Sequence, residues 1–269
     1  MREEGLGTLA GRCIVITRPR AQAAAWVRQL RRRGARPLLC PTIAVVPPAD
    51  WQPLDDALAS LPQFDWLVFT STNGVRFFCQ RLEQCGLELR ALRCLRIAAV
   101  GPRTAQTLRR RGLRVDFVPP TYQAEGLLAG FKRRRMQGKR VLLPRAAQGR
   151  EVLVTTLQAL GAEVLAATVY QTVVPRTGVE SLRQHLQHQA VDMVTFTSSS
   201  AVENLRAMLG QQDWSAWLSE VAVACIGVVT ASTARAHGLR VAVVPAAATI
   251  AGLTAAIVDY YRAKDPISV

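Results

Sequence analysis

Turn-forming residues recur along this sequence at a nearly constant spacing of 126 or 127 positions. The matched positions are Gly34-Ala35 with Gly161-Ala162, Pro48 with Pro175, Phe69 with Phe196, Gly101 with Gly227, Gly112 with Gly238, and Pro119 with Pro245. Glycine and proline punctuate local structure, so a shared pattern of them indicates a duplicated unit. We assign the two copies to residues 11–135 and 138–262. At about 125 residues each, they are two similar domains and not the short stacked units of a solenoid.

Each copy alternates short apolar runs with segments of helical periodicity. The predicted strands are 12–17, 66–69, 95–100, 115–118, 139–143, 193–196, 221–226 and 241–244. Two longer stretches, 35–48 and 162–175, are predicted to be extended, and a helix is predicted from Ala124 to Arg135. Strands that alternate with helices are typical of parallel sheets, so we expect an α/β fold with two parallel-sheet domains.

The two long extended stretches leave the domain boundaries open. Each is longer than the usual strand of about 5–6 residues, so it could leave one domain and enter the next. If both do so side by side, the copies exchange their first strand–helix pairs. The domains would then be 11–38 with 176–262, and 49–162, joined by connectors 39–48 and 163–175. The repeat alone fits two tandem domains equally well.

The chain is strongly basic, with a formal net charge of +15, and only three of its 34 cations are lysines. Three basic clusters close helical patterns: Arg31-Arg32-Arg33, Arg109-Arg110-Arg111 and Lys132-Arg133-Arg134-Arg135. We interpret them as cations that complement the dipoles of helix C-termini, with a nucleic-acid patch as the alternative. Aromatic residues make up 6% and are not interleaved with the clusters, so a single-stranded nucleic-acid platform is not supported.

Composition and cysteine use point to the cytoplasm. No apolar run approaches the roughly 18–20 residues of a membrane span, and the start MREEGLGT lacks the pattern of a signal peptide. The six cysteines form no CxxC motif and read as reduced thiols. We therefore expect a cytoplasmic protein with no membrane partner, and we expect it to be a monomer.

Two strand–helix junctions carry small polar residues where a helix would begin. Thr70, Ser71, Thr72 and Asn73 follow one apolar run, and Ser198 and Ser199 follow its counterpart. Hydroxyl side chains there can cap the helix, and the free backbone N–H groups of a helix start form an anion site. We regard capping alone as one interpretation and capping combined with ligand contact as the other.

The motifs, in their order and spacing, resemble those of uroporphyrinogen-III synthases across residues 12–262. The matching residues are Thr17-Arg18-Pro19, Phe69-Thr70-Ser71 with Gly74-Val75, Val100-Gly101 with Thr104-Ala105, Val169-Tyr170-Gln171-Thr172, Phe196-Thr197-Ser198, and Ile226-Gly227 with Thr230-Ala231. One departure is Val228-Val229, where the family often carries proline after the glycine. We expect this to loosen the helix start there and to weaken the assignment of Thr230.

The resemblance implies a fold and a reaction. The fold is two flavodoxin-like domains joined by a two-stranded β connector, which supports the exchanged boundaries. The reaction is the cyclising dehydration of hydroxymethylbilane to uroporphyrinogen III, with inversion of the last pyrrole ring through a spiro intermediate. The family uses no metal or cofactor, and its substrate is a small polycarboxylate.

In doubly wound folds ligands bind outside the carboxyl ends of the strands. We therefore expect the substrate in a cleft between the domains, held at the helix starts. The expected substrate-binding residues are Arg18, Thr70, Ser71, Thr72, Asn73, Gly101, Thr104, Arg145, Ser198, Ser199, Gly227 and Thr230. For Arg18 and Arg145 the alternative is a solvated strand end, and their matched positions predict one explanation for both. The Arg clusters fall on the far side of each sheet and are not expected in the site.

Tyr170 is the candidate catalytic residue. It lies on the second connector, where we expect its hydroxyl to donate a proton to the departing hydroxyl of the bilane. The alternative is an interface aromatic with a solvated hydroxyl. His185 and His188 have metal-ligand spacing on a helix but no third ligand, and we interpret them as a solvated face.

Two rival functions are also compatible with the sequence. One is a two-domain hinge-bending binder of a small polyanion without chemistry, and the other is an Arg-rich RNA-binding protein. The sequence contains no GxGxxG, P-loop, HExxH or GxSxG motif, which argues against nucleotide-binding, zinc-protease and hydrolase functions.

Overall fold

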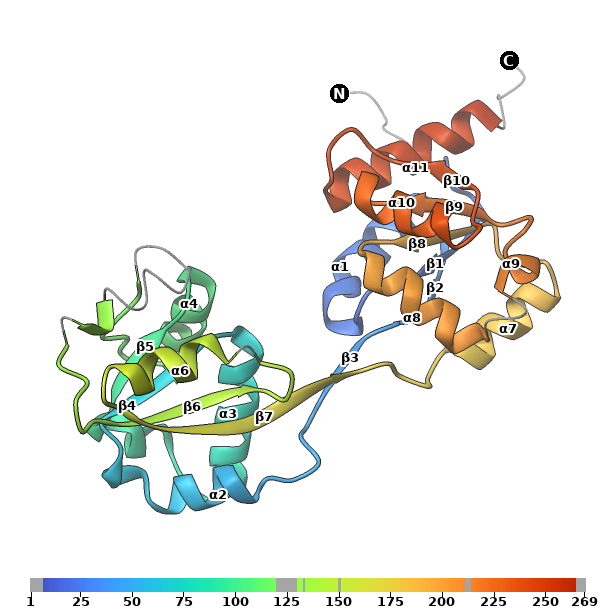
Figure 1. Ribbon diagram of the computed structural model, residues 1–269. Helices are drawn as coiled ribbons and strands as arrows, with labels where there is room; N and C mark the ends of the chain where they lie inside the picture. Colours follow the sequence, from blue (N-terminus) through green and yellow to red (C-terminus); the bar gives the residue numbers. More distant parts are fainter. Residues whose placement is uncertain (1–6, 120–129, 133, 150, 211–213, 265–269) are drawn as a thin grey trace. The chain divides into compact units, whose positions relative to one another are not determined.

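The computed structural model describes residues 7–119, 130–132, 134–149, 151–210 and 214–264. Its chain divides into two compact units, each built around one parallel-dominated sheet (Figure 1). Unit 2 is Val45–Thr172, and unit 1 consists of the chain on either side of it. The helix expected from Ala124 to Arg135 lies mostly outside the described residues. No helix within the described ranges is long and apolar enough to cross a bilayer.

Unit 1 is a five-stranded sheet in the order β10-β9-β8-β1-β2, and every neighbouring pair is parallel. Its strands are β1 (Cys13–Ile16), β2 (Arg36–Leu39), β8 (Met193–Phe196), β9 (Ala222–Cys225) and β10 (Val241–Val243). Its helices are α1 (Arg20–Arg31), α7 (Val179–Gln187), α8 (Ser199–Leu209), α9 (Trp214–Trp217), α10 (Val228–Ala236) and α11 (Ile250–Lys264).

Both faces of this sheet are covered, which explains why its central strands are apolar without alternation. On one face α7, α8 and α10 pack against Val15 and Phe196. On the other, α1 and α11 pack against Ile14 and Ile16. All four residues of β1 and of β8 are buried, as the short continuous apolar runs predict.

Unit 2 has the order β3-β7-β6-β4-β5, in which β7, β6, β4 and β5 run parallel. Its strands are β3 (Ala44–Val46), β4 (Trp66–Phe69), β5 (Arg96–Ala99), β6 (Arg140–Ala146) and β7 (Glu163–Val173). Its helices are α2 (Gln52–Ala59), α3 (Thr72–Gln84), α4 (Pro102–Arg110) and α6 (Val152–Ala159), with the 3₁₀ turns η1 (Leu61–Gln63) and η2 (Leu89–Cys94). Helices α2, α3 and α4 cover one face, and α6 covers the other. Strands matched by the repeat occupy matching places, because β2-β1-β8-β9 corresponds to β7-β6-β4-β5.

The strand expected at 115–118 is reduced to one bridge, between Phe117 and Ala98. Hydrogen bonds still join this segment to β5, from the Asp116 amide to the Ile97 carbonyl and from the Ala99 amide to the Phe117 carbonyl. Pro119 follows two residues later and has no N–H to continue a ladder. The segment therefore extends the sheet edge by a single bridge.

Two of the basic clusters end helices, as predicted. Arg31 is the last residue of α1 and Arg32 its C-cap, while Arg109 and Arg110 close α4. Only part of the third cluster lies among the described residues.

In each unit an aspartate just before one central strand binds the start of the neighbouring central strand. Asp65 precedes β4 and binds the start of β6, and Asp192 precedes β8 and binds the start of β1. In unit 2, Asp65 accepts a hydrogen bond of 2.9 Å from the Arg140 amide and one of 2.7 Å from Lys139 Nζ. In unit 1, Asp192 accepts a hydrogen bond of 2.7 Å from the Cys13 amide and one of 2.9 Å from an Arg12 guanidinium nitrogen. The two carboxylates are 127 positions apart, so the anchor belongs to the repeat.

Asp65 should make stability depend on pH at the acid end. Burial by itself would raise the pKa of Asp65, but the hydrogen bonds from Lys139 and the Arg140 amide, with the nearby cationic charges, leave it lowered. A carboxyl whose pKa is lower in the folded state than in the unfolded state stabilises the fold. Its contribution is fully present when the pH is above the unfolded pKa, about 3.9, and is lost as the pH falls through the folded pKa. We expect urea unfolding to show a larger cost of Asp65→Asn at pH 7 than at pH 3. A cost that is equal at both pH values would contradict this.

Candidate active site

The junction of β4 and α3 lies at the carboxyl end of the unit 2 sheet. Ser71 is the N-cap of α3, and its Oγ accepts a hydrogen bond of 2.9 Å from the Gly74 amide. Thr70 and Thr72 are exposed, and Asn73 is half-buried. Within the described part of the chain no acceptor contacts the backbone amides of Thr72 and Asn73. These two N–H groups are therefore free for an anion.

Tyr170 on β7 meets this junction. Its hydroxyl oxygen lies 3.1 Å from Ser71 Oγ. Its ring stacks on Phe77 of α3, with centroids 5.8 Å apart and an interplanar angle of 16°. One stack and one hydrogen bond thus orient the phenol, at a place where only β6 separates β7 from β4.

The β5–α4 junction lies beside this site in the same sheet. Gly101 is the N-cap of α4, with φ 103° and ψ 153°, and Pro102 occupies the first turn. Thr104 is 4% exposed and belongs to the core-facing side of α4. Gly101 is itself buried at the start of α4, and the Thr104 side chain is turned inward.

Arg145 on β6 does not behave as a free rim cation. Its side chain is 10% exposed and forms an ion pair of 2.6 Å with Glu151, and it also donates to the Gly149 carbonyl. The hydrogen bond from Arg145 holds the pKa of Glu151 below its usual value. The guanidinium is thus largely committed to ordering the loop that leads to α6.

Its counterpart in unit 1, Arg18, has different surroundings. Arg18 is half-buried and donates a hydrogen bond of 2.9 Å to Gln22 Oε1, while its buried Nε has no hydrogen-bond partner among the described residues. The expectation that one explanation serves both arginines is therefore wrong, because only Arg145 has an acidic neighbour six residues later.

The β8–α8 junction of unit 1 repeats the cap. Ser198 is the N-cap of α8, and its Oγ accepts 3.2 Å from the Ala201 amide. Ser199 Oγ accepts 2.8 Å from Thr233 Oγ1 on α10. Among the described residues no acceptor contacts the backbone amides of Ser199 and Ser200.

The β9–α10 junction begins a regular helix despite the missing proline. Gly227 is the N-cap, and the Ala231 amide donates 3.0 Å to its carbonyl. The expected loosening at Val228 is therefore wrong. Val228 and Val229 are 73% and 74% exposed, so they offer apolar surface beside Gly227, while Thr230 is 5% exposed and faces the core.

The thiols near these junctions are not poised as nucleophiles. Burial raises the pKa of Cys225, at the end of β9, to about 12 and that of Cys40 to about 11. Both therefore stay protonated near neutral pH. His185 is half-buried on α7, with Nδ1 2.7 Å from the Ser181 carbonyl, whereas His188 is exposed.

Three residues that support the site were not among the sequence candidates. Phe77 provides the stack for Tyr170, and Thr233 orients Ser199. Gly74 lets α3 approach β6, because a Cβ there would lie 3.3 Å from the Pro144 carbonyl oxygen. Phe77 could have been predicted from the sequence, because it lies five residues beyond the start of a helix whose N-cap the sequence indicates.

Comparisons with known proteins identify relatives over nearly the whole chain. Residues 24–255 match the family model for uroporphyrinogen-III synthase HemD. A uroporphyrinogen-III synthase of Synechococcus elongatus is 35% identical over 94% of this chain and 97% of that protein, and one of Chlorobaculum parvum is 29% identical over 86% and 92%. The structure of a mutant uroporphyrinogen-III synthase of Thermus thermophilus matches with a TM-score of 0.56, at 21% identity, over 94% of this chain and 99% of that one.

Proposed function

Because the chain belongs to the uroporphyrinogen-III synthase family, we propose that it closes linear hydroxymethylbilane to uroporphyrinogen III, with loss of water and inversion of the last pyrrole ring. The observation that carries this assignment is the family match across most of the chain. The protein is thus a cyclising lyase of porphyrin and heme biosynthesis. A non-catalytic hinge-bending binder and an RNA-binding protein are not favoured.

We propose that helix starts hold the carboxylates of the substrate. The amides at Thr72, Asn73, Ser199 and Ser200 lack acceptors in the described chain, and each helix start contributes about 0.3–1 kcal/mol to binding a negative group. Thr70, Thr72 and Ser198 would add hydroxyl groups at these helix starts, and Gly101 and Gly227 would add backbone groups. Thr104 and Thr230 would act by fixing these helix starts, and Arg145 by ordering its loop. Arg18 would bind a carboxylate through its guanidinium, whose Nε has no hydrogen-bond partner in the part of the chain that the structure describes.

We propose that Tyr170 assists departure of the hydroxyl group. Ser71 Oγ already accepts from the Gly74 amide, so its own proton is free to point to the tyrosine oxygen. In that arrangement the phenol O–H points away from Ser71 and can donate to the leaving hydroxyl, which departs as water. Electrons of the pyrrole nitrogen break the carbon–oxygen bond, and a carbon of the last pyrrole ring attacks the resulting electrophile to form the ring-closing carbon–carbon bond. The proton that this ring releases as the macrocycle forms restores the phenol of Tyr170, so that only water is lost overall.

The reaction has a direct test in its product. The protein is incubated with freshly prepared hydroxymethylbilane, the product is oxidised, and the porphyrin isomers are separated. We expect isomer III, whereas heat-denatured protein should leave only the uncatalysed, non-inverted isomer I. Isomer I alone with native protein would overturn the proposed function.

We further propose that the two sheets are flavodoxin-like copies with exchanged boundaries, 11–38 with 176–262 and 49–162. The connectors 39–48 and 163–175 would form the two-stranded link. The matching strand orders support this, and so does β3, which borders β7. Residues 45–172, which are domain 49–162 with the connector that supplies β7, should unfold cooperatively when expressed alone, and a non-cooperative transition would contradict this division.

We propose that the enzyme works in the cytoplasm as a monomer, without a cofactor and without nucleic-acid or membrane partners. Its charge would speed the approach of an anionic substrate. Sedimentation should show one species of 29.4 kDa. A dimer at micromolar concentration would contradict this proposal.

A further inference from the structure

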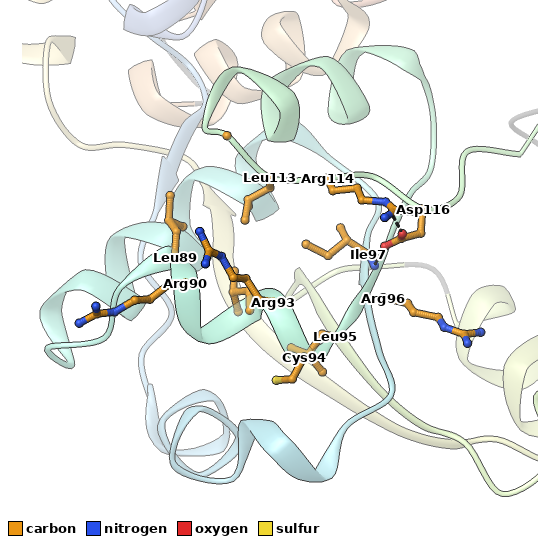
Figure 2. Close-up of a pocket in the computed structure, with 12 residues that line it drawn as sticks. Leu89, Arg90, Arg93, Cys94, Leu95, Arg96, Ile97, Leu113, Arg114 and Asp116 are labelled. Carbon is orange, nitrogen blue, oxygen red and sulfur yellow. Dashed lines mark hydrogen bonds and ion pairs between the residues drawn. The ribbon is translucent and has the colours of Figure 1, made fainter.

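Unit 2 has a basic pocket at the amino edge of its sheet, away from Ser71 and Tyr170. Figure 2 shows the residues that line it. The pocket has a volume of about 430 Å³ and lies between η2, the start of β5 and the turn after α4. Arg96 pairs in register with Trp66, the first residue of β4, whereas Ser71 follows the last. The pocket and the proposed active site are thus separated by the length of the strands, roughly 13 Å for four residues.

Four arginines line this pocket against a single aspartate. They are Arg90, Arg93, Arg96 and Arg114. Arg114 pairs with Asp116 at 3.0 Å, and Arg90 pairs with the exposed Glu88 at 2.9 Å. Arg93 has no ion pair among the described residues, and Figure 2 shows it reaching between Leu89 and Leu113.

The floor of the pocket is apolar. Leu92, Leu95, Ile97 and Leu113 are each at most 9% exposed, and their side chains belong to the core under α3 and α4. A cavity of this size, with an apolar base and a few charged groups at its rim, has the character of a small-molecule site.

Comparison of matched positions in the two units shows which of the pocket residues the fold requires. Unit 1 also has a pocket of about 370 Å³ beside the start of β9, but its other walls come from the ends of α7 and α11 and not from the turn at 238–240 that matches 112–114. At an offset of 126, Arg90, Arg93 and Arg96 are replaced there by Ala216, Ser219 and Ala222. The charged residues that line the unit 1 pocket are Asp192, Glu220 and Lys264. The matched positions of unit 1 carry none of these three arginines, so the fold does not require them in unit 2.

We propose that this basic pocket binds a small organic polyanion, with phosphate or carboxylate groups on an apolar body, at a site separate from the proposed active site. Arginine forks pair with either group in a bidentate manner. The apolar floor favours a ligand with a flat or hydrocarbon body over a bare inorganic ion. The proposal does not depend on the cyclisation activity.

Cys94 provides a probe in the unchanged protein. It lines the pocket and is exposed, while Cys85 is also exposed but lies outside the pocket. Alkylation by iodoacetamide is followed at both thiols by peptide mass spectrometry, with ATP, with benzene-1,2,4,5-tetracarboxylate, or with adenosine as the uncharged control. We expect the bound anion to slow alkylation at Cys94 but not at Cys85. The alkylation rate at Cys94 should fall in proportion to the fraction of sites that remain unoccupied.

The two anions separate the chemical sources. Protection by ATP alone identifies a phosphate ligand, protection by the tetracarboxylate alone identifies a carboxylate ligand, and protection by both identifies a general polyanion site. Protection by neither at millimolar concentration overturns the proposal. So does equal slowing at both thiols, or protection by adenosine.

A variant with a matched control tests the arginines. Arg90→Ala/Arg93→Ser/Arg96→Ala carries the unit 1 residues, and Arg28→Ala/Arg31→Ser/Arg32→Ala removes the same charge from exposed positions on and beside α1. We expect affinity for the protecting anion to fall about tenfold or more in the first variant, because charge-assisted hydrogen bonds are lost, and to stay within about twofold in the second. Equal losses, or no loss in the first, would overturn the proposal. If the triple variant unfolds, Arg93→Ser alone is compared in the same way.

Discussion

Replacement of Tyr170 by phenylalanine is expected to lower kcat by roughly 10- to 100-fold, at the low end of general-acid effects. The change removes only the hydroxyl that lies 3.1 Å from Ser71 and keeps the ring that stacks on Phe77. The pyrrole nitrogen already expels the leaving hydroxyl, and positioning of the bent chain supplies much of the acceleration. Turnover should therefore slow without stopping.

The loss should appear in kcat, measured as the initial rate of isomer III formation, with little change in KM. Tyr260→Phe is the matched control, because it removes the same group from α11. Ser71→Ala should lower kcat less than Tyr170→Phe, since it removes the partner that orients the phenol but leaves the donor. An unchanged rate for Tyr170→Phe would end its catalytic assignment and would leave the family assignment intact.

The local parts of this structure could be predicted from the sequence. The caps at Ser71 and Ser198 follow from a hydroxyl placed between an apolar run and a helical pattern, and both were confirmed. Thr104 and Thr230 were instead expected to contact the substrate, and the structure buries both side chains.

Contacts between distant residues could not be predicted in this way. Tyr170 and Ser71 are 99 positions apart and meet only because β6 lies between β7 and β4. The burial of Arg145 depends on Glu151 and on the loop between them, for which the repeat offers no counterpart at Arg18. The basic pocket combines η2 with a turn near Gly112, and neither segment has a motif of its own. Patterns along the chain specify which element forms, whereas strand order decides which elements share an edge.

The matched glycines Gly101 and Gly227 should differ sharply in what they tolerate. The repeat makes them equivalent, and each caps a helix after a strand. Gly101 has φ 103° and ψ 153°, a conformation that is essentially restricted to glycine. Gly227 has φ −168° and ψ 174°, which is extended backbone that any residue adopts, and a Cβ there would meet only Ala248 at 3.5 Å.

We therefore expect Gly101→Ala to lower the free energy of unfolding by about 1–3 kcal/mol, the cost of a strained backbone residue. In a chain of this size each kcal/mol should lower the melting temperature by about 2–4 °C in scanning calorimetry. Gly227→Ala should cause no loss and can stabilise by up to about 1 kcal/mol, because alanine restricts the unfolded chain. Hydrogen exchange should localise the first effect to α4 and leave α10 protected. Equal destabilisation by both changes would mean that the repeat, and not the local backbone, governs these helix starts.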